Sequence, residues 1–253
     1  MSEAIYGLTD VSNRAPVDEI RKNFLLEVSN SPDLYDKIDV ERVSTEDWEI
    51  ERFILCHKNI DKAFEELIKS IQWKKSYGLH DRDHTYFPKE LVHIFGYEKF
   101  SRDTDGRVVG WIAGSRYKKI GQFSPLIYQY GFYVVEMIDR MAGNKGWTVV
   151  ADHHGAGLAN VDMNLFYMGL EALKYYPMGF KLMINIDLPW LLNSIIKFCL
   201  TLLPKSLHQS LVFIKRNQLT NYININDIPV PYGGVREVTC ELTQQIANSL
   251  NYD

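Results

Sequence analysis

The chain has 253 residues, 46% of them hydrophobic and 24% charged, with a formal net charge of −4. This composition indicates a globular protein with a sizeable core and excludes a disordered, collagen-like or disulfide-framed chain. The acidic balance also argues against a nucleic-acid-binding protein, which would present a strongly basic face. The three cysteines are widely spaced and form no Cys-x-x-Cys pair, which predicts a reducing compartment.

The first part of the chain is predicted to be helical. Pro16, followed by acids, starts one helix, and Ser44 is the expected cap of a second. Asp61 is the expected cap of a third helix, which Gly78 ends after a run of apolar residues at helical spacing. The residues before Pro16 lack the apolar run of a signal peptide, so we expect a soluble protein of the cytoplasm.

From residue 97 onward, short apolar strands alternate with helices. A hairpin is expected first, and the other predicted strands are 147–151, 181–186 and 211–214. The predicted helices are 125–141, 163–175 and the segment after Pro189. This order predicts an α/β domain with a mostly parallel sheet and helices on its faces, preceded by an amino-terminal helical subdomain. The expected boundaries are 1–78 for the helical region, 79–236 for the sheet domain and 237–253 for a polar tail.

Residues 188–226 contain no Asp or Glu. Within them, residues 190–203 are apolar around most of a helix, and such a helix must be buried on all sides or must face another apolar phase. At about 21 Å long, this helix is too short to cross a hydrocarbon layer of about 30 Å. The cations of this stretch suit an anionic membrane surface. They are Lys197, Lys205, Lys215 and Arg216.

The polar residues that follow the predicted strand and Asp152 could form a metal or nucleotide site, and the sequence pattern bears on both hypotheses. His153 and His154 are adjacent, so their side chains diverge, and no third ligand follows at a suitable spacing. Gly155-Ala-Gly157 lies where a phosphate-binding turn would lie, but Asn160 replaces the third glycine of the dinucleotide motif. No nucleophile motif occurs either. We therefore predict no metal, no cofactor and no catalytic residue, and keep a nucleotide-dependent enzyme as the weakest alternative.

Five motifs occur in the order found in the CRAL-TRIO lipid-binding family, and the chain resembles that family over residues 40–236. They are Trp48-Glu-Ile-Glu-Arg-Phe-Ile-Leu, Asp105-Gly-Arg-Val-Val, Trp147-Thr-Val-Val-Ala-Asp152 with Gly155, Tyr175-Tyr-Pro with the strand up to Pro189, and Ile228-Pro-Val-Pro-Tyr-Gly-Gly234. Two further segments are most similar to members that also carry a major-sperm-protein domain and a membrane anchor. These segments are Asp187-Leu-Pro-Trp-Leu-Leu-Asn and Asn226-Asp-Ile-Pro.

The resemblance implies a pocket for one hydrophobic ligand or lipid, closed by a mobile gate helix after Pro189. It implies exchange of that ligand with membranes through transient peripheral contact, without enzymatic activity. The expected cavity residues are Trp111, Phe132, Val149, Phe166, Ile184 and Ile186. The expected gate residues are Trp190, Leu191, Ile195, Phe198 and Leu202. The expected membrane-surface cations are Lys197, Lys205, Lys215 and Arg216.

The chain departs from the members of the family that bind phosphatidylinositol. Those members carry Ser and Thr on the strand before the Asp, where this chain has Trp147 and Val149. Met178 replaces a Glu, and Ser210 or Leu211 replaces a Lys. An inositol phosphate needs such charge-assisted partners, so a sterol, an isoprenoid or another phospholipid is expected equally. The alternative function is an adaptor that binds a membrane or a protein without transferring lipid.

Overall fold

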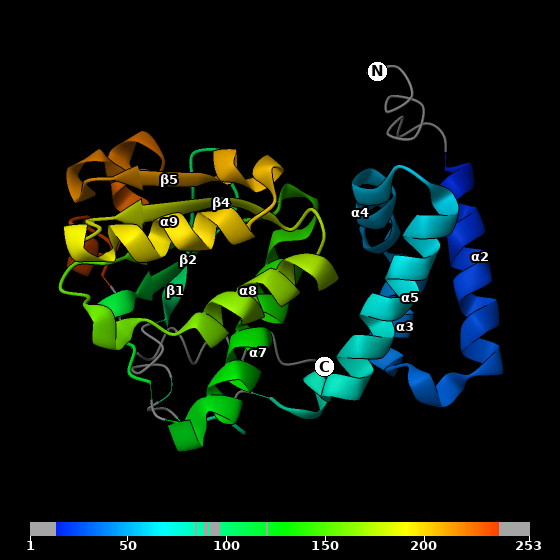
Figure 1. The fold of residues 1–253 in the computed structure, drawn as a ribbon. Helices are drawn as coiled ribbons and strands as arrows, with labels where there is room; N and C mark the ends of the chain where they lie inside the picture. The colour runs from blue at the N-terminus through cyan, green and yellow to red at the C-terminus, as the bar shows by residue number, and fades with distance from the viewer. Residues whose placement is uncertain (1–13, 84, 89–90, 92–96, 120, 238–253) are drawn as a thin grey trace. The chain divides into compact units, whose positions relative to one another are not determined.

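The computed structural model describes residues 14–83, 85–88, 91, 97–119 and 121–237. The chain forms two compact units (Figure 1), one made of Met1–Asp83 with Glu171–Gly179 and the other of His84–Leu170 with Phe180–Asp253. The boundaries inferred from the sequence stay predictions. The polar tail expected for 237–253 lies outside the described residues from 238 onward.

The first unit is helical. Its core is formed by apolar residues that recur at helical spacing, such as Phe24, Ile50 and Leu67. Gly78 ends the last helix in the left-handed conformation, at φ 66°, as predicted. Its helices are α2 (Ala15–Asn30), α3 (Lys37–Thr45), α4 (Trp48–His57) and α5 (Ile60–Tyr77).

Two predicted caps in this unit are wrong. Ser44 lies in the last turn of α3 and donates to the Val40 carbonyl at 2.6 Å, so it does not begin α4. Asn59, rather than Asp61, caps α5, because its side chain accepts the Lys62 amide at 2.8 Å.

The Tyr175-Tyr-Pro motif belongs to the first unit and is held by its helices. Ser70 of α5 donates to the Tyr175 carbonyl at 2.8 Å, and the Tyr175 ring stacks on Trp73 with centroids 4.1 Å apart. Arg52 of α4 is buried and donates from Nε to the Pro177 carbonyl at 2.8 Å. These contacts therefore hold the end of helix α8 (Met163–Tyr175) and the residues just after it against α4 and α5.

The second unit is built on a five-stranded sheet of order β1-β2-β3-β4-β5. The strands are β1 (Tyr97–Arg102), β2 (Val108–Ala113), β3 (Trp147–Asp152), β4 (Phe180–Ile186) and β5 (Leu211–Ile214). Strand β1 is antiparallel to β2, and the other pairs are parallel. Helices α7 (Ser124–Ala142), α8 and α9 (Asn193–Leu202) connect the parallel strands (Figure 1). The predicted α/β fold class is confirmed.

The carboxyl-terminal segment covers one face of this sheet, which we call the closed face. Five of its strand residues have no exposed surface and pack with Leu219, Ile223, Ile228 and Tyr232, while Leu182, Val212 and Ile214 of the same face are partly buried. Gly234 is required there, because a Cβ atom at this position would lie 1.9 Å from the Ile228 carbonyl oxygen. The closing Gly-Gly of the sequence is thus explained by packing. The five fully buried residues of the closed face are Val109, Trp111, Val150, Ile184 and Ile186.

Helix α7 covers the opposite face at the amino-terminal ends of the strands. Val108 of β2 and Trp147 of β3 are buried there against Ile127, Tyr130 and other residues of α7. The Trp147 indole nitrogen donates to Asp139 at 3.2 Å. This packing leaves the carboxyl-terminal half of the same face to other elements.

Candidate functional site

The part of that second face beyond Val108 and Trp147 is less completely covered, and we call it the open face. Several of its apolar residues are partly buried or, for Phe213, 43% exposed, while Ala151 and Asn185 of the same face are buried. On the closed face, Val150 and Ile184 of the same strands have no exposed surface. A parallel sheet is normally covered on both sides, so accessible apolar side chains on the interior strands β3 and β4 make this face a candidate binding surface. The open face consists of Ile112, Val149, Ala151, Met183, Asn185, Leu211 and Phe213.

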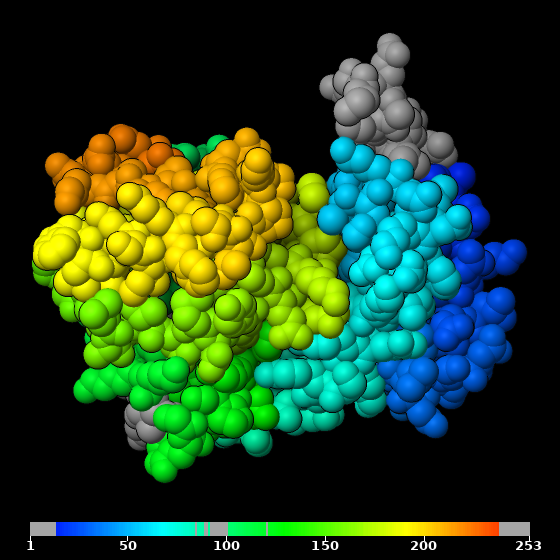
Figure 2. Space-filling model, viewed as in Figure 1, coloured from blue at the N-terminus to red at the C-terminus, as the bar shows by residue number. Residues whose placement is uncertain are grey.

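Helix α9, which follows β4, is apolar and has no buried residue. Burying an apolar side chain of this size stabilises a protein by about 1.5–3 kcal/mol, so such a helix is costly to leave accessible. Its residues, yellow in Figure 2, form part of the visible surface of the second unit. Only Leu192, in the turn before α9, is buried. None of the described helices is both long and apolar enough to cross a membrane.

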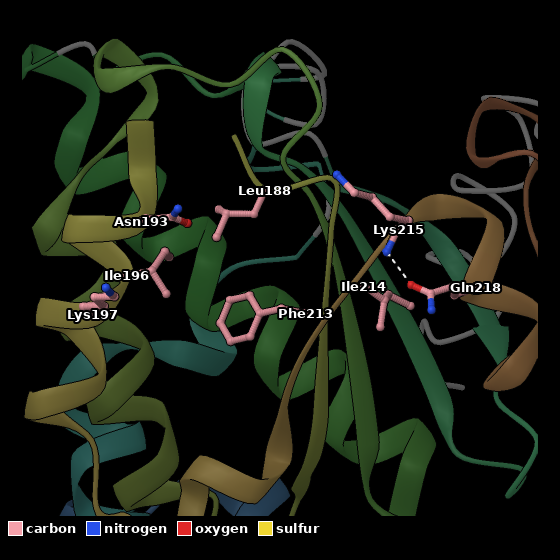
Figure 3. A pocket seen from close by; sticks show the side chains of 8 residues that line it. All are labelled: Leu188, Asn193, Ile196, Lys197, Phe213, Ile214, Lys215 and Gln218. Atoms are coloured by element: carbon pink, nitrogen blue, oxygen red, sulfur yellow. Dashed lines mark hydrogen bonds between the residues drawn. The ribbon is translucent and has the colours of Figure 1, made fainter. Parts of the chain in front are cut away.

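A pocket of about 390 Å³ lies between α9 and the edge strand β5. Asn193, Ile196 and Lys197 line it from the helix, and Phe213 of the open face lies opposite them (Figure 3). The pocket therefore adjoins the open face at the edge of the sheet. Its other lining residues are Leu188, Ile214, Lys215 and Gln218.

Comparison with known proteins identifies the family. The sequence matches the CRAL/TRIO domain over residues 96–234, which is more than half of the 253 residues. The chain belongs to the CRAL/TRIO domain family. A structure described as the crystal structure of Sfh5 shares the fold with a TM-score of 0.60 and 13% identity, covering 93% of this chain and 97% of that chain. CRAL/TRIO domains typically bind lipophilic ligands and are mostly not enzymes.

The six residues predicted to line the CRAL/TRIO cavity do not lie together. Trp111, Ile184 and Ile186 pack on the closed face, whereas Val149 lies on the open face. Phe132 of α7 is buried, and Phe166 of α8 is partly buried. Successive strand residues point to opposite faces, so one cavity cannot be lined by both groups. The sequence predicted the strands but not which alternate residues face the ligand.

The predicted gate residues lie on and just before α9, and most are exposed. Trp190 is 83% exposed and Phe198 is 52% exposed, while Ile195 is partly buried. Leu191 and Leu202 are also exposed. The sequence analysis missed Ile196, which lines the pocket. Ile196 lies about 160° from Phe198 around the helix, at 100° per residue, so helical phase alone could have assigned the two residues to different sides.

Arg216 differs from the other predicted membrane-surface cations, because its charge is balanced inside the protein. Its Nη2 donates to Asp152 at 2.8 Å, and its Nε donates to Asp187 at 3.1 Å. Partial burial alone would lower the pKa of Arg216, but the two carboxylates raise it. Lys197, Lys205 and Lys215, by contrast, are exposed. We no longer count Arg216 among the cations free to meet a membrane.

The same ion pairs fix the turn that leads from β4 into α9. Asp187 holds a left-handed conformation, with φ 53°, which is unfavourable for a non-glycine residue. Its carboxylate accepts from the Arg216 backbone amide at 3.2 Å, and its own amide donates to the Ile214 carbonyl at 3.1 Å. Arg216 also donates to the Pro231 carbonyl at 2.9 Å. Arg216 is therefore the residue that ties the start of the gate to β3 and the carboxyl-terminal segment.

Replacing Arg216 by Ala should lower the free energy of unfolding by about 2 kcal/mol, because two partly buried carboxylates lose their partner. Urea denaturation followed by circular dichroism measures the loss. Lys205→Ala, which removes an exposed cation of the same acid-free stretch, should change stability by less than about 0.5 kcal/mol. Equal stability of the two variants would contradict the role given to Arg216.

The loop after β3 satisfies its own polar groups. A ring nitrogen of His153 lies 3.0 Å from the Asn185 side-chain oxygen. The Gly157 amide donates to the Asn160 side chain at 2.8 Å, and the Ala156 amide donates to the His153 carbonyl at 3.0 Å. A phosphate-binding turn needs free amides that point at its ligand, and these two amides are already occupied.

Proposed function

We propose that the protein binds one lipophilic ligand against the open face and exchanges it with membranes, with α9 as the gate. The observation that carries this proposal is the difference between the two faces at the middle of β3 and β4. Val150 and Ile184 are completely buried on the closed face, while Val149 and Met183 stay partly accessible on the open face. A bound hydrocarbon would supply the missing cover, at about 0.8 kcal/mol per buried CH₂ group.

The two sides of α9 support its role as a gate. Ile196 faces the pocket next to β5, while Phe198 is more than half exposed. In a closed state the first side covers the ligand, and in an open state the second side contacts the bilayer. A membrane shifts the equilibrium toward the open state only through such differential contact. The exposed Lys197 and Lys205 add attraction to an anionic surface.

The ligand that we propose is a sterol, an isoprenoid or a phospholipid other than phosphatidylinositol, because Trp147 and Val149 replace the polar strand residues of phosphatidylinositol-binding relatives. We place the protein in the cytoplasm, with transient peripheral attachment to membranes. A finer resemblance, to the lipid-binding domain of motile sperm domain-containing protein 2, rests on Asp187-Leu-Pro-Trp-Leu-Leu-Asn and Asn226-Asp-Ile-Pro. The tethering function of that protein is not part of the proposal.

Native mass spectrometry of the purified full chain, followed by extraction and identification of lipids, tests this proposal. We expect one apolar molecule to be released from each chain. A chain purified without ligand should take one up from vesicles. Absence of a co-purified ligand together with absence of uptake would contradict the proposal.

The second candidate function is an adaptor that contacts a membrane or a protein but moves no ligand. The exposed Trp190, beside the exposed Leu191, favours a contact surface of this kind. Transfer of a fluorescent lipid between donor and acceptor vesicles separates the two functions, because an adaptor would bind vesicles without accelerating transfer.

A further inference from the structure

Asn185 is the polar residue of the open face, whose other residues are apolar. It is only 4% exposed. A buried amide must be hydrogen-bonded, and the Asn185 side-chain nitrogen donates to the Val212 carbonyl at 3.3 Å. A carbonyl oxygen can only accept, so this contact fixes which end of the amide faces Val212. The side-chain oxygen of Asn185 therefore points toward His153, whose Nε2 lies 3.0 Å from it.

The orientation of Asn185 decides which nitrogen of the neutral His153 ring carries the hydrogen. Nε2 faces an oxygen atom that can only accept, so Nε2 carries the hydrogen and donates it. Nδ1 of the neutral ring is then left with a lone pair and is an acceptor. The tautomer of His153 thus follows from two hydrogen bonds that begin at a backbone carbonyl.

His153 Nδ1 is an unoccupied acceptor at the end of the open face, although the loop amides around it are occupied. The His153 amide donates to the Ile186 carbonyl at 3.0 Å, so His153 continues the alternation of β3 and lies on the same side as Ala151. Among the described residues, none donates a hydrogen bond to Nδ1. The nitrogen keeps accessible surface, because the fully buried side-chain polar atoms without a partner in the described chain are Trp48 Nε1 and the Tyr232 hydroxyl oxygen.

Gly114, directly after β2, lies beside this nitrogen. A Cβ atom at that position would be 3.6 Å from His153 Nδ1, so the glycine itself does not fill the space on that side of the ring. None of the residues of the open face is charged. An ionised head group there would lose its hydration without gaining a partner, whereas a neutral donor would find an acceptor in Nδ1.

We propose that His153 Nδ1 accepts a hydrogen bond from a hydroxyl group of the ligand, so that the protein selects an uncharged lipophilic alcohol. The inference rests on the proposed function and deepens it, because it names one polar contact within the open-face site. An alcohol has a hydrogen to donate to Nδ1, whereas an ether, an ester or a hydrocarbon has none. Sterols and isoprenoid alcohols share this hydroxyl group, so the experiment includes both.

The test compares each alcohol with its methyl ether in binding to the full chain, measured by native mass spectrometry of ligand titrations. The probes are the sterol dehydroergosterol, the isoprenoid geranylgeraniol and the methyl ethers of both. The wild-type chain should bind at least one alcohol about three- to tenfold more tightly than its ether, the effect of one neutral hydrogen bond. The alcohol that shows this preference identifies the class of ligand.

His153→Gln should abolish the preference and leave the chain folded. Glutamine can still donate an amide hydrogen to the Asn185 oxygen in place of Nε2, but it has no acceptor where Nδ1 lies. His153→Phe keeps a flat ring without either nitrogen, so it should also bind alcohol and ether within twofold of each other. His154→Gln is the matched control, because His154 is the exposed neighbour in the same loop, and it should keep the wild-type preference.

Equal binding of alcohol and ether by the wild-type chain would overturn the assignment of a hydroxyl group. A full preference in both His153 variants, or an equal loss in His154→Gln, would show that His153 is not the acceptor. In these cases a ligand still binds, so the proposed function stands. A wild-type chain that binds none of the four probes would also overturn the inference, and only failure of the ligand test above in addition would contradict the proposed function.

Discussion

Replacing Ile195 and Phe198 together by Asp should slow lipid transfer between vesicles by tenfold or more and leave the sheet folded. Contact of these side chains with a bilayer contributes about 1.5–3 kcal/mol each, and two carboxylates would remove that contribution and oppose insertion. The fold should tolerate the change because Phe198 is 52% exposed and Ile195 is only partly buried. A fluorescence transfer assay measures the rate, and urea denaturation measures stability.

Ser194→Asp with Thr201→Asp is the matched control for this variant. Both are exposed polar residues of α9, so the control adds the same charge to the same helix without replacing an apolar side chain. It should keep most of the transfer rate. A wild-type transfer rate in the Ile195 and Phe198 variant would show that α9 is not the gate. An equal loss in both variants would assign the effect to charge repulsion instead.

The order of strands and helices in the second unit could be predicted from apolar periodicity alone. Helix α8 (Met163–Tyr175) and strand β5 (Leu211–Ile214) begin and end where the sequence indicated. The orientation of the strands could not be predicted in the same way. Apart from Thr148, residues 147–151 of β3 are apolar on both sides of the strand, so alternation does not show which side stays open. That choice depends on the carboxyl-terminal segment, whose Leu219 and Tyr232 cover the closed face.

The role of Arg216 shows a second limit of local sequence patterns. A stretch without acids, residues 188–226, suggested that its cations were free. The acids that bind Arg216 are Asp152 and Asp187, which end two adjacent parallel strands and lie together only in the folded sheet. Lys197 and Lys215 are exposed. A count of charges along the chain could not predict the ion pairs of Arg216.

Trp111 tests the assignment of the two faces most directly. Its side chain has no exposed surface, its ring centroid lies 4.6 Å from that of Tyr232, and its indole nitrogen donates to Ser101 at 3.0 Å. Trp111→Ala should therefore lower the free energy of unfolding by about 3–5 kcal/mol, the range for deleting a large buried aromatic side chain. Urea denaturation with linear extrapolation gives the value.

Met183 of β4 lies on the open face, so Met183→Ala is the variant to compare with Trp111→Ala. Met183 is only partly buried, so this variant should lose about 1 kcal/mol of stability and should bind the lipophilic ligand more weakly. If Trp111→Ala instead kept wild-type stability and lost the ligand, the cavity would lie on the face now assigned to the core. Trp111 shares its face of the sheet with Ile184, the neighbour of Met183 in β4, so Trp111 and Met183 lie on opposite faces. Trp111→Ala should therefore cost mainly stability, and Met183→Ala mainly ligand binding.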